Sequence, residues 1–176
     1  IAVIYAGIQG GKTFSDCLAG YPKIFSPLFV AMVQAGEESG NLKEALIRIS
    51  DYQKKQEELY VKIRLALAYL YRQVGLLGQA REQAQWALRH VSLKDRDLAA
   101  RELAWANYKM FLYEDALDAL DFIRETGDSD WALRGRIHAA RGQWSLAHRA
   151  FGRIEISSPQ LDFWKGWSLW QMGQRR

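Results

Sequence analysis

The sequence predicts an all-α protein, on two observations. It holds three Pro in 176 residues and few runs of β-branched residues, which is typical of a helical chain. In addition, residues 71–159 repeat one pattern of small and apolar residues three times. The pattern recurs after 36 and then 31 residues, and a period of about 34 is the signature of stacked helix–turn–helix units. We therefore expect a partial helical bundle that continues into an α-solenoid of about three and a half helical hairpins.

Each repeat unit is defined by five positions, with spacings of four, five, four and three residues. The three sets are Tyr71, Gly75, Ala80, Ala84 and Ala87; Asn107, Phe111, Ala116, Leu120 and Ile123; and His138, Gly142, Ala147, Phe151 and Ile154. In the third unit, Gly142 can end the first helix, because glycine tolerates the left-handed conformation. Ala147 lets the second helix approach closely, Phe151 fills the gap between neighbouring units, and Pro159 starts the next helix.

At these positions residues 61–176 resemble the tetratricopeptide repeat (TPR), and a fourth unit begins and reaches Gly173. A generic α-helical hairpin bundle is the alternative. Five matched positions in three consecutive units favour the repeat.

The enzymatic alternative rests on a glycine-rich stretch near the start of the chain. Residues 1–5 are apolar and partly β-branched, and residues 6–13 match the phosphate-loop pattern with Ala6 in place of the first glycine. A strand followed by this turn would bind phosphates in a nucleotide hydrolase through Gly11, Lys12 and Thr13. Because no second run resembling a buried strand follows, we expect the match to be accidental.

The order of motifs in the same region has a more specific interpretation. A glycine turn and short helix lead to Pro22-Lys23-Ile24-Phe25, then to Gly36-Glu37-Glu38-Ser39-Gly40-Asn41-Leu42. A long amphipathic helix follows and ends in Lys62-Ile63-Arg64-Leu65-Ala66-Leu67-Ala68-Tyr69. Over residues 1–69 this order resembles the cytoplasmic domain of the type II secretion F family, the assembly platforms of type II secretion systems and type IV pili. The resemblance implies that residues 1–10 end a helix and that Gly11-Lys12-Thr13 is a turn.

The residues themselves also predict this local structure. Ser26 can cap a helix that Pro27 begins and that buries Leu28, Met32 and Val33. Gly36 and Gly40 should bracket a tight turn, and Asn41 with Glu44 forms a capping box. Glu37 and Glu38 could be catalytic or metal-binding carboxylates. Because no His or further acidic cluster joins them, we expect a polar loop and helix cap.

The junction between the two parts should be one continuous helix. In the family, the final Tyr is followed by Pro and a membrane segment, whereas here Tyr69 is followed by Leu70 and repeat sequence. No Pro lies between Lys54 and Gly75. We therefore expect a truncated F-like bundle over 1–69 and TPR-like repeats over 61–176 that share this helix, in a natural protein, an engineered fusion or segments joined across a gap.

The repeats offer two candidate surfaces for protein partners. The first helix of each unit would line a groove that is basic and aromatic, which favours a partner segment with acidic and apolar residues. Its residues are Tyr69, Arg72, Arg101, Trp105, Tyr108, Lys109 and Arg136. The second is an aromatic stripe of Trp164, Trp167 and Trp170, which either caps the third unit or forms an exposed end surface that invites a partner helix or self-association. For the groove, the alternative is that the aromatic residues pack between units and the basic ones are solvated.

Composition narrows the function further. The net charge of +4 permits an acidic partner without demanding nucleic acid. The single Cys17 fits a reducing compartment, and the three His show no metal-ligand spacing. No apolar run approaches the roughly 20 residues of a membrane span. We expect no catalytic, cofactor or metal residues.

These observations predict a non-enzymatic protein-interaction scaffold of a secretion or type IV pilus assembly machine, in the cytoplasm at the inner face of a bacterial inner membrane. Its partners would be protein components of that machine, and the scaffold could form a homo-oligomer. The alternatives are a generic TPR adaptor or secretion chaperone, and the nucleotide hydrolase.

Overall fold

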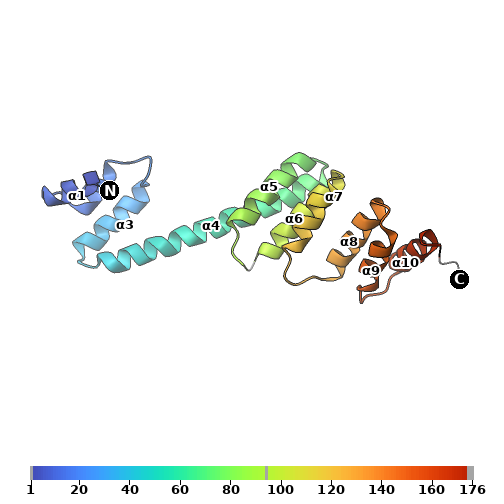
Figure 1. The fold of residues 1–176 in the computed structure, drawn as a ribbon. Coiled ribbons are helices and arrows are strands. Elements are labelled where there is room, and N and C mark those ends of the chain that lie inside the picture. Colours follow the sequence, from blue (N-terminus) through green and yellow to red (C-terminus); the bar gives the residue numbers. More distant parts are fainter. Residues whose placement is uncertain (1, 94, 174–176) are drawn as a thin grey trace. The chain divides into compact units, whose positions relative to one another are not determined.

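The computed structural model describes residues 2–93 and 95–173, and every regular element in these ranges is an α-helix (Figure 1). The ten helices are α1 (Ala2–Gln9), α2 (Phe14–Ala19), α3 (Pro27–Glu38), α4 (Leu42–Gln73), α5 (Leu77–His90), α6 (Arg96–Lys109), α7 (Tyr113–Asp121), α8 (Asp128–Ala140), α9 (Trp144–Gly152) and α10 (Pro159–Gln171). The predicted all-α class is confirmed. Contacts divide the chain into two compact units, unit 1 (Ile1–Glu57) and unit 2 (Glu58–Arg176).

The strand that a phosphate loop requires is not formed. Residues 2–9, which include most of the apolar stretch, make helix α1. A short apolar run is compatible with either a strand or a helix, and here Ala2 and Ala6 supply helix-forming residues that a buried strand would not use. The resemblance to the type II secretion F family gave the correct prediction at this point.

Unit 1 is built around one small apolar core. Leu18 of α2, Val33 of α3 and Ile49 of α4 are almost fully buried and lie in contact. The expected burial of Leu28 is wrong, because half of its surface is exposed, whereas Met32 packs against the core. The start of α3 agrees with the sequence, since the Ser26 side chain accepts a hydrogen bond from the N–H of Phe29 and Pro27 opens the helix.

The two glycines that were predicted to bracket the turn between α3 and α4 have different roles. Gly40 has a φ of 70° and makes the turn, as predicted. Gly36 instead lies inside α3 and is buried. A Cβ atom at Gly36 would come within 2.4 Å of the Cβ atom of Ala45, so glycine is needed there for the close approach of α3 and α4.

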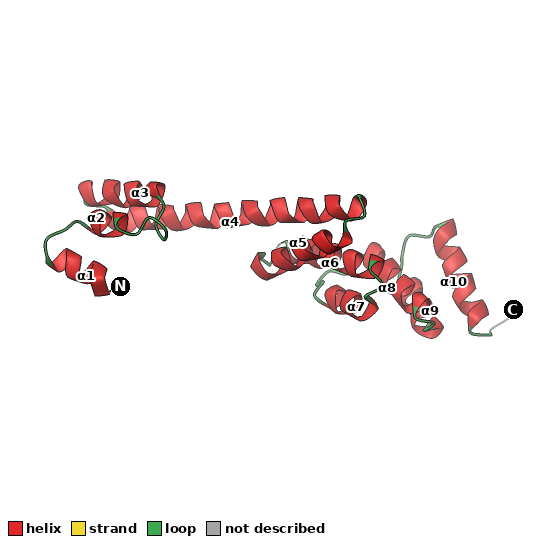
Figure 2. Ribbon diagram, turned by 90° about the horizontal axis from the view of Figure 1, so that it is seen from above, coloured by secondary structure: helices red, strands yellow, loops and turns green. Residues whose placement is uncertain are grey.

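Helix α4 is continuous from Leu42 to Gln73, which confirms the single helix predicted at the junction (Figure 2). Its last residues belong to unit 2, where Val61 and Leu65 pack with Ala87 of α5 and Ala99 of α6.

Unit 2 repeats one hairpin geometry at the predicted positions. Four helices end at a residue with a left-handed backbone: Gly75 (φ 82°), Phe111 (62°), Gly142 (71°) and Gly173 (74°). After each of the first three, the next N–H bonds back to a carbonyl five residues earlier. These bonds are Leu76 to Tyr71 (2.8 Å), Leu112 to Asn107 (2.9 Å) and Gln143 to His138 (2.8 Å). The equivalence deduced from sequence spacing is therefore a structural equivalence.

The small and aromatic residues of the pattern form the contacts within and between hairpins. Ala80, Ala116 and Ala147 are buried at the facing side of each second helix. Phe151 is buried, packs against Gly135 of α8 and lies 5.9 Å from the Trp164 ring of α10. Phe151 therefore fills the space between consecutive helical hairpins, as predicted.

Candidate functional site

The predicted groove residues lie on α4, α6 and α8, and five of the seven form one contact chain. The guanidinium of Arg72 lies 5.2 Å from the ring centre of Tyr69 and 5.9 Å from that of Trp105. Arg136 lies 6.0 Å from Trp105, and Trp105 meets Tyr108 edge to face at 5.8 Å. Two cations thus flank one indole ring, which favours cation–π attraction. We call these five residues the basic-aromatic chain.

Two of the predicted cations are neutralised by carboxylates that sequence reasoning missed. Arg72 forms a two-point ion pair with Glu102 at 2.9 and 3.3 Å, in which both side chains are largely buried. Arg101 bonds the buried Asp130 at 2.9 Å and the Glu125 carbonyl. The hydrogen bond from Arg101 to Asp130 raises the pKa of the guanidinium, although burial opposes it. These pairs join consecutive helical hairpins, so Arg72 and Arg101 have a structural role.

The remaining charge of the predicted groove lies on Lys109 and Arg136. Lys109 is exposed at the end of α6. Arg136 forms no ion pair with any residue that the structure describes, and its cation is held by Trp105 alone.

Two apolar grooves border the basic-aromatic chain. The first, of about 470 Å³, lies between α4 and α6 and is lined mainly by Leu65, Ala66, Tyr69, Leu70 and Leu98. The second, of about 320 Å³, lies between α8, α9 and α10, with Phe151, Ile154, Leu161 and Trp164 as its apolar lining and Arg136 at its rim. No sequence pattern singled out Leu98 and Ala66 as groove residues, because the residue type alone does not show whether a single position of a helix is exposed or buried.

The Trp stripe on α10 is divided between interior and surface. Trp164 packs inward against Phe151 and Leu161. Trp167 and Trp170 are 38% and 52% exposed, and Trp167 stacks on the exposed Phe163. Three residues advance a helix by about 300°, so side chains spaced by three drift around the axis. Trp164 caps the third hairpin, and the end surface consists of Phe163, Trp167 and Trp170.

The N–H groups of Gly10, Gly11 and Lys12, which a phosphate loop would offer to its ligand, donate instead to the carbonyls of Ala6, Ile8 and Gly7 in α1. The carboxylate of Glu37 accepts hydrogen bonds from the N–H groups of Phe14 and Ser15, at 2.6 and 2.9 Å, and from the Ser15 hydroxyl at 2.5 Å. These bonds, with the Ser15 hydroxyl as the largest cause, lower the pKa of Glu37. Glu37 lies in the last turn of α3 and not in the polar loop that the sequence predicted, and its carboxylate caps the start of α2.

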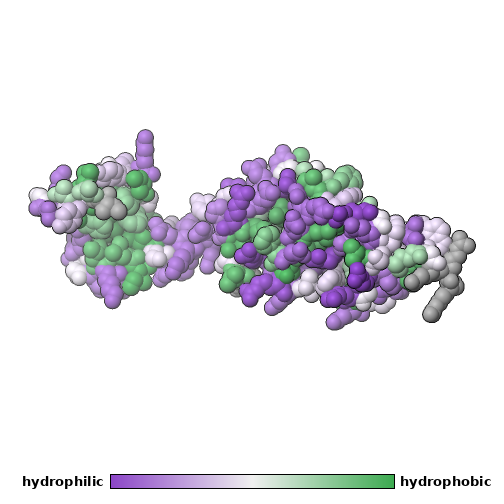
Figure 3. Space-filling view, viewed as in Figure 1, coloured by the Kyte–Doolittle hydropathy of each residue, from purple (hydrophilic) through white to green (hydrophobic). Residues whose placement is uncertain are grey.

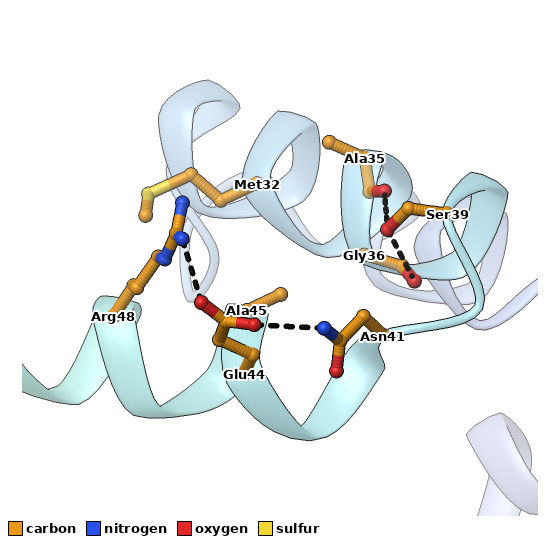
Figure 4. Close-up of a pocket in the computed structure, with 8 residues that line it drawn as sticks. All are labelled: Met32, Ala35, Gly36, Ser39, Asn41, Glu44, Ala45 and Arg48. Atoms are coloured by element: carbon orange, nitrogen blue, oxygen red, sulfur yellow. Dashed lines mark hydrogen bonds and ion pairs between the residues drawn. The ribbon is translucent and has the colours of Figure 1, made fainter.

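A cavity of about 360 Å³ lies elsewhere in unit 1, between α3 and α4 (Figure 4). Its carboxylate, Glu44, is bonded to Arg48 at 2.6 Å and to the amide of Asn41 at 2.7 Å. The capping box predicted for these two residues is therefore wrong: Asn41 bonds Glu44 side chain to side chain, and its N–H donates to the carbonyl of Gly36. Ser39 bonds the carbonyls of Ala35 and Gly36, so its hydroxyl is also engaged.

Neither unit presents a cation-binding cluster: within residues 2–93 and 95–173, no three His, Cys, Asp or Glu side chains gather to hold a metal ion. In the same residues, no helix has the length and apolar character needed to cross a membrane. The geometry defines a class of protein: a helical bundle and stacked helical hairpins that offer surfaces and grooves.

Comparisons with known proteins show which family the first part is similar to. Residues 1–79 match the family model "Type II secretion system (T2SS), protein F". Type II secretion system protein F of Vibrio cholerae is 38% identical over 69 residues, which is 39% of this chain and 17% of the relative. Type IV pilus assembly protein PilC of Thermus thermophilus is 45% identical over 62 residues, 35% of this chain and 15% of the relative. The resemblance of residues 1–69 to this family of secretion and pilus assembly components is confirmed.

Each match covers only a minor part of this chain and of the relative with which it is compared. The chain spans less than a fifth of the length of the curated relatives that it matches, for example 16% of PilC of Myxococcus xanthus. No solved structure matches the chain. The family match ends at residue 79 and therefore includes only the first residues of α5. The rest of the helical hairpins lie outside the matched region, and their resemblance to TPR stays a prediction.

Proposed function

We propose that the chain is a non-enzymatic scaffold that holds protein partners in a secretion or type IV pilus assembly machine. The match of residues 1–79 to the type II secretion F family supports a place in such a machine. The repeated helical hairpins of unit 2 support the binding of protein partners as the mode of action. On this proposal the chain works in the cytoplasm, at the inner face of a bacterial inner membrane.

The partner would be a protein segment that carries both acidic and apolar residues and lies across Tyr69, Arg72, Arg101, Trp105, Tyr108, Lys109 and Arg136. One observation carries this proposal: the basic-aromatic chain connects three helices, α4, α6 and α8, with apolar grooves on its borders. Apolar side chains of the segment would enter the grooves. A carboxylate would meet Arg136, the free cation beside Trp105.

A photo-crosslinking experiment in the native host tests this function. Arg136 is replaced by a photoreactive p-benzoylphenylalanine, and Glu82, an exposed residue of α5 away from the chain of contacts, is the matched control. We expect Arg136 to crosslink to components of a secretion or pilus assembly machine and Glu82 not to. Identical products at both positions would contradict the proposed site.

A generic adaptor or secretion chaperone is the second candidate. One observation favours it: apart from the first residues of α5, the helical hairpins from α5 to α10 lie outside the region that matches the family. The same crosslinks separate the two functions, because an adaptor would capture proteins unrelated to the machine at Arg136.

A further inference from the structure

The turn between α6 and α7 holds a phenylalanine at a backbone position that suits glycine. The φ of Phe111 is 62°, in the left-handed region where Gly75, Gly142 and Gly173 stand in the other helical hairpins. In that region the Cβ atom of any residue except glycine crowds the backbone, and a bulky side chain is rare there. Glycine makes the same turn elsewhere in this chain, so the turn itself does not require Phe111.

Packing within the chain does not explain this choice of residue. Phe111 is 76% exposed, and its ring meets that of Tyr113 edge to face at 6.3 Å. By contrast, Tyr108 and Tyr113 are partly buried against a core of unit 2. Backbone strain that the fold does not need is found mainly at functional positions.

The turn presents the Phe111 ring on a fixed backbone. The N–H of Phe111 donates to the carbonyl of Tyr108 at 3.0 Å. The N–H of Leu112 donates to the carbonyl of Asn107 at 2.9 Å, and the buried Asn107 side chain binds the Asp115 carbonyl at 3.1 Å. A side chain held in this way loses little conformational freedom when a partner binds, which favours affinity.

Phe111 is also continuous with the basic-aromatic chain. The ring centre of Tyr108, the last residue of that chain, lies 6.2 Å from the ring centre of Tyr113, which in turn contacts Phe111. The exposed Lys109 stands between Tyr108 and Phe111 in the sequence. The aromatic surface that begins at Trp105 therefore reaches the turn after α6 and passes an exposed cation.

We propose that Phe111 is a hydrophobic anchor for the partner segment. An apolar side chain of the segment packs on the exposed ring of Phe111, and a carboxylate of the same segment lies beside Lys109. This inference rests on the proposed function, because the segment is the one that crosses the basic-aromatic chain. Aromatic residues are enriched in the cores of protein interfaces and among the residues that dominate binding energy.

The proposal predicts that stability and binding change in opposite directions. Phe111→Gly relieves the backbone strain and raises the midpoint of urea unfolding, but it removes the anchor and weakens binding. Phe111→Tyr keeps an aromatic ring on the same backbone and should preserve both quantities. A purely structural residue would not behave in this way, because its loss would lower the midpoint.

Photo-crosslinking in the native host tests the contact. p-Benzoylphenylalanine in place of Phe111 should capture the same protein as it does in place of Arg136, identified by mass spectrometry. Phe122, which is 45% exposed and has an ordinary φ of −75°, is the matched control and should not capture that protein. Capture at Arg136 but not at Phe111 would overturn the anchor alone. No capture at either position would overturn the proposed function and the anchor together.

The yield of the Arg136 crosslink then measures how much the anchor contributes. In a Phe111→Gly background this yield should fall about tenfold, the effect of losing one important interface residue. Phe111→Tyr should restore the yield, and Phe122→Ala should leave it unchanged. An unchanged yield in Phe111→Gly would overturn the proposal, and so would a lower yield that is accompanied by a lower urea midpoint.

Discussion

In unit 1 a single carboxylate joins parts of the chain that are far apart in sequence, whereas in unit 2 similar contacts recur from one helical hairpin to the next. Glu37 binds the start of α2, more than 20 residues away. In unit 2, Asp97 accepts the N–H groups of Arg124 and Glu125, and 31 residues later Asp128 accepts those of Glu155 and Ile156. One unit depends on a unique contact, and the other on a repeated one.

The interiors of the two units differ as well. Unit 1 has one small core of Leu18, Val33 and Ile49, and it exposes apolar side chains over the face seen in Figure 3. Unit 2 buries small residues in three clusters, with Ala84, Ala100, Ala104 and Ala116 in the largest. Unit 2 exposes large apolar side chains as well, for example Phe111, Ile156 and Trp170, so the two units differ in the size of the residues that they bury and not in how apolar their surfaces are.

The largest expected effect breaks a repeated contact of unit 2. Ala147 is completely buried, and Ala147→Leu should overpack the third hairpin and cost about 1–3 kcal/mol of unfolding free energy. Urea unfolding followed by Trp fluorescence measures it, since all seven Trp belong to unit 2. Ala140→Leu, at an exposed position of α8, should leave the midpoint almost unchanged. Equal stability of both variants would count against a close helix contact at Ala147.

A smaller effect sharpens the equivalence of the helical hairpins. Phe111 holds a left-handed φ of 62° at the position where Gly75 and Gly142 stand in their units, and its ring is 76% exposed. Phe111→Gly should therefore stabilise unit 2 by about 0.5–1 kcal/mol. Gly142→Ala, the converse change, should destabilise it by about 1–2 kcal/mol. The same urea series measures both, and a loss of stability in Phe111→Gly would show that its ring contributes more than the strain costs.

Acid titration tests the unique contact of unit 1. Hydrogen bonds from Ser15 and Phe14 lower the pKa of Glu37 in the folded chain below its ordinary value of 4.5. The stabilisation is therefore present above about pH 4.5 and is lost as the pH falls through the lowered pKa. The protection factors of the Phe14 and Ser15 amides, which compare the observed exchange with the intrinsic rate at each pH, should fall over that acid range.

The variants separate this contact from general acid effects. Glu37→Gln should exchange faster at neutral pH and lose most of the acid dependence. Glu38→Gln, the neighbouring carboxylate on the exposed side of α3, should behave as the unchanged chain. Burial tends to raise the pKa of Asp97, but hydrogen bonds from N–H groups and nearby arginine charges outweigh it, so this pKa is lowered. Hydrogen bonds from N–H groups also lower the pKa of Asp128. Because unit 2 therefore has an acid dependence of its own, the two units need separate probes.

The sequence predicted the parts of this fold that periodicity encodes. Gly75, Phe111, Gly142 and Gly173 fell at equivalent positions because hairpin geometry requires a left-handed residue at a fixed distance from a small one. Phe111 could be placed by spacing alone, although its residue type argues against that backbone.

Contacts between distant residues could not be predicted in this way. The pairing of Arg72 with Glu102 and of Arg101 with Asp130 depends on which helices become neighbours and on side-chain direction. A basic residue on the correct helix was therefore assigned to a partner although the chain itself neutralises it. In the same way Gly36 was assigned to a turn, because a glycine for close helix approach and a glycine for a turn have the same letter.

The smallest expected effect concerns the glycine-rich stretch. Lys12 is exposed, residues 2–9 are helical, and Glu37 holds the N–H groups at the start of α2. Lys12→Ala should therefore change neither stability nor the result of a titration with Mg-ATP or Mg-GTP, in which we expect no saturable binding by either protein. Glu37→Gln is the informative companion, because it frees the N–H groups without restoring a strand. Saturable binding that Lys12→Ala abolishes would show that the anion site is accessible to phosphate and that the accidental-match interpretation is wrong.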